Sequence, residues 1–102
     1  MAFTEKVTAD NSPVSGETVE NGIQNVQDKG KTENITVGGR GGQIVQYGGL
    51  AENTLIKDNG WQSVSPGGTV ENTIIENGGE LIVNVRGKVK DTTIQCFLFS
   101  II

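Results

Sequence analysis

The sequence contains no histidine and a single cysteine, Cys96. Histidine is the most common general base and metal ligand in proteins, so its absence removes the usual centre of a catalytic or metal site. One cysteine cannot form a disulfide within the chain. Hydrophobic residues make up only 34% and aromatic residues 5% of the 102 positions, which favours one domain of short strands and many turns. We expect neither a cofactor nor a metal.

Long apolar runs and clusters of positive charge are also missing. Met1–Asp10 has no apolar stretch of the kind found in a signal peptide, and the densest apolar run, Cys96–Ile102, is too short to cross a bilayer. Twelve acidic and eight basic residues are spread along the chain and give a net charge of -4, whereas binding to a nucleic-acid backbone requires clustered Lys and Arg. We therefore predict no signal peptide, no membrane insertion by this chain and no nucleic-acid partner.

A repeat of nineteen residues runs through most of the sequence. Lys31–Gly49, Leu50–Gly68 and Thr69–Gly87 follow one another with no insertion or deletion, and a fourth copy starts at Lys88 and stops after eight residues. Ser12–Gly30 matches only the second half of the unit. A fixed period of this length indicates a stacked-repeat architecture, in which each unit buries its inner face only against its neighbours.

Three positions of the unit carry small, β-branched or aliphatic residues in successive copies. β-Branched residues favour extended strands, and glycine interrupts the unit too often for a helical face. We predict that these columns form the core. Their members are Thr32, Ala51, Val70 and Val89; Val37, Ile56, Ile75 and Ile94; and Val26, Val45, Val64 and Val83.

Three corners separate the predicted strands of each coil. Two are marked by glycine, which takes positive φ at no steric cost, so we expect a tight turn at each. The third is marked by Asn34, Asn53, Asn72 and then Asp91, and we expect these Asn amides to bond to one another from coil to coil. The glycine columns are Gly22, Gly41, Gly60 and Gly79, and Gly30, Gly49, Gly68 and Gly87.

The predicted fold is therefore an all-β parallel β-helix, or β-solenoid, of about four to five coils of nineteen residues. Coils should rise by about 4.8 Å each, the spacing of hydrogen-bonded strands. We divide the chain into an irregular N-terminal segment, 1–15, the repeats, 16–95, and an apolar C-terminal tail, 96–102. Either the tail caps the last coil or it is an unrelated remnant, and both interpretations stay open.

Glu33, Glu52 and Glu71 occupy equivalent positions and should stack about 5 Å apart. Paired carboxylates can perform acid and base chemistry, and β-helices often carry sites that cleave polysaccharides. Equivalent repeat positions are also what simple scaffolding predicts, and no Arg or Lys joins the acids at a matching place. We expect that the chain is not an enzyme.

Two aromatic residues, Tyr47 and Trp61, replace residues that are polar or variable in the other copies, so both should point outward. Exposed aromatic rings can contact a sugar or another chain, but each ring could instead lean on the neighbouring coil.

Hydroxyl side chains fall into two groups. Alternation turns the column of Thr54, Thr73 and Thr92 inward. Four others are out of phase with the core and should face solvent, which makes them candidate glycan acceptors. These are Thr36, Ser63, Ser65 and Thr93.

The cadence ENT-I-x-x-GG-x-Q-x-V-x-x-GG resembles the repeats of AIDA-type self-associating autotransporter adhesins. Ala51–Ile56, Gly60, Gln62, Val64 and Gly67–Gly68 carry the resemblance, and Val70–Ile75, Gly78–Gly79 and Val83 repeat it. It extends over about Gly16–Gln95. The chain has fewer coils than a full passenger and no translocator barrel, so it looks like a fragment.

The resemblance implies a right-handed parallel β-helix at the cell surface, on the outer membrane or secreted, as part of a full-length virulence protein. It implies autoaggregation, biofilm formation or adhesion, with another copy or a host-cell surface as partner. It also implies O-linked heptose on Ser and Thr, added by a cytoplasmic autotransporter heptosyltransferase. An acceptor substrate of that enzyme is the alternative function, and a β-helical polysaccharide-active enzyme is the least favoured.

Overall fold

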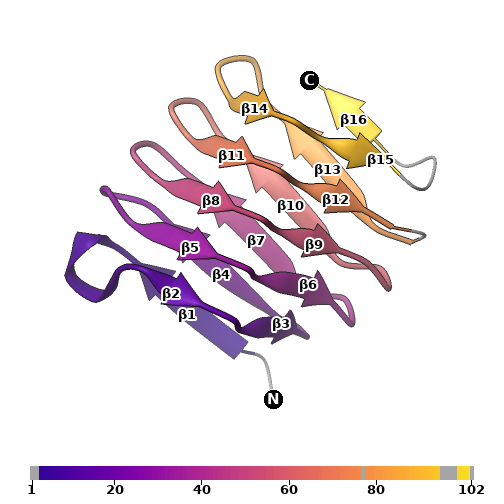
Figure 1. Ribbon diagram of the computed structural model, residues 1–102, viewed down its shortest axis with the longest axis horizontal. Coiled ribbons are helices and arrows are strands. Elements are labelled where there is room, and N and C mark those ends of the chain that lie inside the picture. The colour runs from indigo at the N-terminus through magenta and orange to yellow at the C-terminus, as the bar shows by residue number, and fades with distance from the viewer. Residues whose placement is uncertain (1–2, 77, 95–98, 102) are drawn as a thin grey trace.

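The computed structural model describes residues 3–76, 78–94 and 99–101 of the chain. These residues form three parallel sheets that wrap around a common axis, and each coil adds one strand to each sheet (Figure 1). In Figure 1 the strands of two sheets cross the front from left to right, and those of the third return behind them as the coils advance from N to C. The winding is therefore right-handed, and the fold is the β-solenoid that the repeat predicts.

The sheets are called A, B and C here. Sheet A contains β1 (Phe3–Val7), β4 (Gly22–Val26), β7 (Gly42–Val45), β10 (Trp61–Val64), β13 (Glu80–Val83) and β16 (Phe99–Ile101). Sheet B contains β2 (Val14–Ser15), β5 (Lys31–Glu33), β8 (Leu50–Glu52), β11 (Thr69–Glu71) and β14 (Lys88–Lys90). Sheet C contains β3 (Thr18–Glu20), β6 (Thr36–Gly38), β9 (Leu55–Ile56), β12 (Ile74–Ile75) and β15 (Thr93–Ile94). A short 3-10 helix, η1 (Ala9–Asn11), lies between β1 and β2.

The core consists of the predicted aliphatic columns. Each inward side chain lies over its equivalent in the next coil, as the register of Val26 with Val45 and of Val45 with Val64 shows. Val89, in the last coil, is only partly buried, and the side chain of Ile94 lies outside the described set. The other described members of the three columns are buried: Val26, Thr32, Val37, Val45, Ala51, Ile56, Val64, Val70, Ile75 and Val83.

The glycine corners are present, but positive φ, the reason that we gave for the glycine columns, is wrong for Gly49 and Gly68. Gly49 and Gly68 do not have positive φ; the residues before them, Gly48 and Gly67, do, with φ of 81° and 84°. A Cβ on Gly49 would lie 2.2 Å from the carbonyl oxygen of Val26 in the preceding coil, and one on Gly68 would lie 2.3 Å from that of Val45. These glycines are required because one coil approaches the backbone of the next, and their own φ needs no glycine.

The predicted turn at the Asn corner is confirmed, whereas the predicted hydrogen bonds between its side-chain amides are not formed in the part of the chain that the structure describes. Asn34, Asn53 and Asn72 have φ of 57°, 57° and 56°, the left-handed geometry that Asn tolerates. Their side chains are exposed, and among the described residues no hydrogen bond joins one of these amides to another. Backbone groups continue the stack instead, since the Asn53 N–H donates to the Glu71 carbonyl over 2.9 Å.

The first fifteen residues, which we expected to be irregular, contain β1 and β2. β1 pairs in parallel with β4, and Val7 is fully buried in register with Val26. The segment thus supplies part of the first coil. The alternation of Phe3–Val7 is compatible with a strand, but the segment lacks the glycines and the Asn corner that mark the later copies.

The described part of the apolar tail adds a strand. β16 pairs in parallel with β13, with Phe99 opposite Leu81, so it extends sheet A at the C-terminal end. Cys96, residues 97–98 and Ile102 lie outside the described residues. No helix among the residues described is long and apolar enough to cross a membrane.

Candidate functional site

The four candidate glycan acceptors lie on two sheets and form no single cluster. Ser63 lies on β10 and Ser65 directly follows it, and both are partly exposed. Thr36 and Thr93 share one outward column of sheet C, separated by Leu55 and Ile74, and Thr93 is the more exposed. The structure therefore offers one sparse column of threonines and one pair of serines.

A fifth hydroxyl, Thr18, continues the threonine column and was missed by the sequence analysis. Thr18 lies opposite Thr36 and is exposed. The two are eighteen residues apart rather than nineteen, because the turn after β3 is one residue shorter than the equivalent turn after β6. Aligning the first coil with a one-residue gap would have found it.

Thr93 also lines a groove at the bend between sheets B and C. The groove has a volume of about 460 Å³, and Ile74, which is 38% exposed, forms part of its apolar floor. The Asn corner forms its polar rim. Its lining residues are Asn53, Thr54, Leu55, Asn72, Ile74, Asp91, Thr92 and Thr93.

The interior contains a ladder of glutamine amides that the sequence analysis did not predict. Gln24, Gln43 and Gln62 are fully buried in register on β4, β7 and β10. Gln43 Nε2 donates to Gln24 Oε1 over 2.8 Å, and Gln62 Nε2 donates to Gln43 Oε1 over 2.6 Å. The amides thus satisfy one another where no water reaches, which removes most of the cost of burying them.

The ladder ends differently at its two ends. At the C-terminal end the equivalent residue is Leu81, and Thr73 Oγ1 donates to Gln62 Oε1 over 3.4 Å instead. At the N-terminal end Gln24 Nε2 donates to Glu5 Oε1 over 2.8 Å and to Glu17 Oε1 over 3.3 Å. Partial burial raises the pKa of Glu17 to about 7, with the hydrogen bond to Glu5 and the charge of Glu5 adding to the effect.

The stacked acids of sheet B are joined by a lysine, contrary to our expectation. Glu33, Glu52 and Glu71 are in register on β5, β8 and β11. Lys31 Nζ lies 3.3 Å from Glu33 Oε2 and 3.5 Å from Glu52 Oε1, and these partners raise the pKa of Lys31. Lys90 takes the acid's place in the last coil. Such pairing is typical of a solvated surface, where ion pairs contribute little to stability.

The two aromatic side chains adopt different positions. Tyr47 is 79% exposed, as expected, although its ring also leans on Gly67 of the next coil. Trp61 is only partly exposed because its ring covers Gly42 of the preceding coil, where an added Cβ would lie 2.1 Å from Trp61 Cζ2. Trp61 therefore takes the alternative that we left open, a ring leaning on its neighbour. Across the described chain, no group of three His, Cys, Asp or Glu side chains is arranged to hold a metal.

No family model matches the sequence, and a search of curated proteins found no match. Among solved structures, the chain is similar to the crystal structure of a TibC-catalysed, hyper-glycosylated fragment of TibA, with a TM-score of 0.70 and 30% sequence identity. The match covers 92% of this chain and 39% of the TibA chain, so the protein spans well under half the length of that neighbour. The fold thus resembles that of a fragment of the autotransporter adhesin TibA.

Proposed function

We propose that this chain is part of the passenger of a bacterial autotransporter adhesin and that its outward Ser and Thr side chains accept O-linked heptose. The observation that carries the proposal is the likeness to a TibA fragment that is itself glycosylated by TibC. The solenoid supports it, because outward hydroxyls recur on strands that stack in register. The partners are then an autotransporter heptosyltransferase before export, and another copy or a host cell at the surface.

The threonine column of sheet C is the best-placed acceptor. Glycosyl transfer requires a hydroxyl that reaches solvent, and Thr18 and Thr93 are both exposed. Thr93 lies beside a groove with an apolar floor, where the transferase could hold the chain. Thr36, Ser63 and Ser65 are partly exposed, and we rank them second as acceptors.

Coexpression with a TibC-type heptosyltransferase tests the acceptor role. Intact mass should show added heptose units, and replacement of Thr18, Thr36, Ser63, Ser65 and Thr93 by Ala should remove most of the added mass. Thr54→Val is the matched control, because Thr54 is buried and should not be modified. An unmodified wild-type chain, or full modification of the Ala variant, would contradict the role of these residues.

The adhesive role is tested separately by self-association. Sedimentation velocity of the full chain, with and without the sugars, should show association that depends on concentration. A chain that stays monomeric in both forms would leave the acceptor role as the better proposal and would remove homophilic contact.

We propose no catalytic activity for the stacked acids. Lys31 shares its charge between Glu33 and Glu52, as in an ion-paired scaffold, and the same column ends in Lys90. Cleavage of an acidic or neutral polysaccharide that is abolished by Glu52→Gln and Glu71→Gln would overturn this proposal and revive the enzyme alternative.

A further inference from the structure

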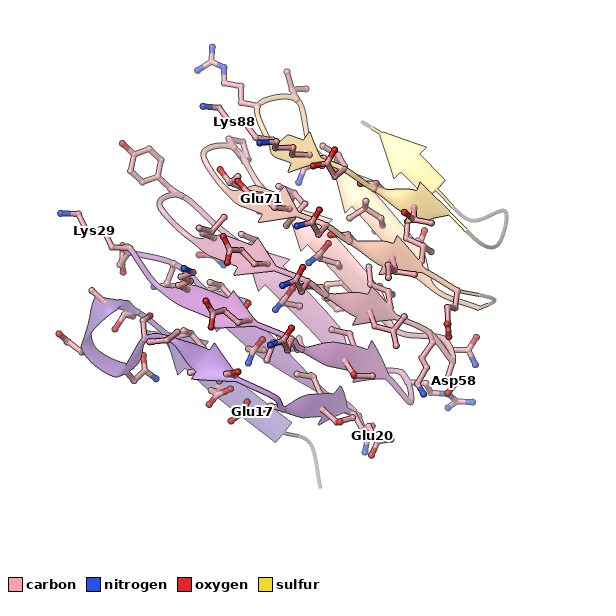
Figure 2. The ribbon with its side chains drawn as sticks, in the orientation of Figure 1. Glu17, Glu20, Lys29, Asp58, Glu71 and Lys88 are labelled. Carbon is pink, nitrogen blue, oxygen red and sulfur yellow. The ribbon has the colours of Figure 1, made fainter. Side chains whose placement is uncertain are left out.

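The turns that join sheet A to sheet B form a second groove, which the proposed function does not use. We call it the turn groove, and its volume is about 630 Å³. Lys29 and Lys88 both project from this edge of the solenoid in Figure 2. The lining residues are Asp28, Lys29, Tyr47, Gly48, Gly67 and Lys88.

Backbone hydrogen bonds stack these turns and align their side chains. Lys29 N donates to Gly48 O over 3.0 Å, Gly48 N to Gly67 O over 3.0 Å, and Gly67 N to Arg86 O over 3.1 Å. One column of turn positions therefore reads Lys29, Gly48, Gly67, Arg86. The two glycines have no side chains, which leaves room for the Tyr47 ring over Gly67, and a cation lies at each end of the column. Three coil spacings of about 4.8 Å place those ends about 14 Å apart.

Tyr47 forms a fixed wall of the groove. Its N-terminal neighbour in the stack is Asp28, whose N–H donates to the Tyr47 carbonyl over 3.2 Å. The ring leans on Gly67, where an added Cβ would lie 2.4 Å from Tyr47 Cδ2, and yet the residue is 79% exposed. A ring that is held against backbone loses little freedom when a ligand stacks on it, which favours binding.

The charge at this edge is opposite to that of the chain. The net charge is -4, whereas three cations, Lys29, Arg86 and Lys88, lie at this edge with two acids, Asp28 and Asp10. A local excess of positive charge beside an exposed ring favours a ligand that is anionic and has a flat, weakly polar face. A saccharide that carries a carboxylate or a sulfate has both properties.

We infer that the turn groove binds an acidic saccharide. Tyr47 stacks on a sugar ring, Lys29 and Lys88 bind anionic groups on different sugar units, and Asp28 accepts hydrogen bonds from sugar hydroxyls. This inference deepens the adhesive part of the proposed function by giving the ligand class, and it is independent of the acceptor residues.

The test is calorimetric titration of the purified full chain with three defined oligosaccharides at low salt. A galacturonic acid tetramer carries carboxylates, a heparin-derived tetrasaccharide carries both carboxylates and sulfates, and maltotetraose is neutral. We expect binding of at least one acidic probe and none of maltotetraose. Binding of both acidic probes indicates that a carboxylate suffices, and binding of the heparin fragment alone indicates that sulfate is required.

Variants locate the site. Tyr47→Ala should weaken binding about three- to tenfold, the usual value of a stacked aromatic contact. The pair Lys29→Gln and Lys88→Gln should weaken it further and reduce its salt dependence. Lys57→Gln, at the opposite corner between sheets C and A, is the matched control and should bind as the wild type does.

Three outcomes would overturn the inference. Neither acidic probe binds, maltotetraose binds equally well, or the affinity is unchanged both in Tyr47→Ala and in the double Lys variant. The acceptor role is measured by mass on other residues, so either proposal can fail while the other stands. If self-association persists in Tyr47→Ala, homophilic contact uses a surface other than the turn groove.

Discussion

Gln43 is the residue whose hydrogen bonds connect most of the interior. Its amide donates to Gln24 Oε1 and to Thr32 Oγ1, and it accepts from Gln62. It joins three coils and two sheets through one side chain, and all these groups are buried. A buried donor or acceptor that loses its partner costs more than the bond itself contributed.

We predict that Gln43→Leu destabilises the fold by about 3 kcal/mol, because it leaves Gln24 Oε1 and Gln62 Nε2 without a partner in a dry interior. Urea unfolding followed by circular dichroism measures the change. Thr54→Val is the control: Thr54 Oγ1 is buried without a partner, so its loss should be neutral or stabilising. A Gln43→Leu variant as stable as the wild type would mean that the ladder contributes nothing.

The sequence predicted the valine columns but missed the glutamine column, because only apolar residues were assigned to the core. Val45 and Val64 are apolar and occupy equivalent positions of the repeat, so their inward position follows from the sequence. Gln43 lies two positions before Val45, so alternation also turns it inward, but a polar residue is usually assigned to the surface. Tyr47 and Trp61 each lean on a glycine of an adjacent coil, yet Tyr47 is much the more exposed, and this difference was visible only in the structure.

Turns between strands carry the closest backbone contacts of the solenoid. Gly49 approaches the carbonyl of the preceding coil, while Gly48, with φ of 81°, makes the left-handed step beside it. The sequence identified the glycine columns correctly. It assigned positive φ to the column of Gly49, whereas the residue with positive φ is Gly48. Only the structure shows which glycine has positive φ and which one lies against the backbone of the preceding coil.

We predict that Gly49→Ala costs at least about 3 kcal/mol of stability, because its Cβ would lie 2.2 Å from Val26 O and the coils would have to separate. Gly16→Ala is the matched comparison: Gly16 has φ of 74° with open space around it, so only the conformational cost of about 1 to 2 kcal/mol applies. The urea midpoint should therefore be lower for Gly49→Ala than for Gly16→Ala. The reverse order would contradict close approach as the reason for glycine.

The first coil shows where a strict repeat misleads. β3 pairs with β6 at an offset of eighteen residues, while β4 pairs with β7 at nineteen. A nineteen-residue template therefore placed β4 and the repeats from β5 onward correctly but lost the register of β2 and β3, which hid Thr18 and β2. β1 keeps the offset of nineteen, and it was missed because its segment lacks the glycines and the Asn corner of the later copies. Of the predicted acceptors, the structure places all four on outward positions, and their modification stays a prediction.

Glu17 at the N-terminal end makes stability depend on pH. Its pKa is raised from 4.5 to about 7 in the folded state, so the folded chain holds a proton that the unfolded chain has lost between these values. Stability should therefore be greatest below about pH 4.5 as far as this group is concerned and should fall as pH rises to about 7. Glu17→Gln should remove that fall, whereas Glu71→Gln on sheet B should keep it. Thermal unfolding between pH 4 and pH 8 measures both, and a wild-type profile in the Glu17 variant would contradict the assignment.

The solenoid as one body is stabilised only between neighbouring coils, so its two ends are its weakest parts. At the C-terminal end β16 covers the edge of β13. At the other end, β1, β2 and β3 have pairing partners on one side only. The nineteen-residue period and the glycine columns predicted the stacked fold itself. They could not predict how the ends are covered.

We predict that a chain ending at Gln95 unfolds at a lower urea concentration and associates more readily, because loss of β16 exposes the backbone edge of β13. Sedimentation velocity and urea unfolding on the two lengths measure this. A shorter chain with the same midpoint and the same sedimentation would show that β16 does not protect the edge.

The hydrogen bonds of the glutamine ladder all point in the same direction along the stack of coils. Each amide donates toward the N-terminus and accepts from the C-terminal side, so a coil carrying glutamine can be duplicated between two others without breaking a bond. Glu5 supplies the acceptor at the start of the ladder, whereas Leu81, whose side chain can neither donate nor accept a hydrogen bond, ends it. Such a protein can be lengthened by copying its middle units, while its first and last units cannot be exchanged.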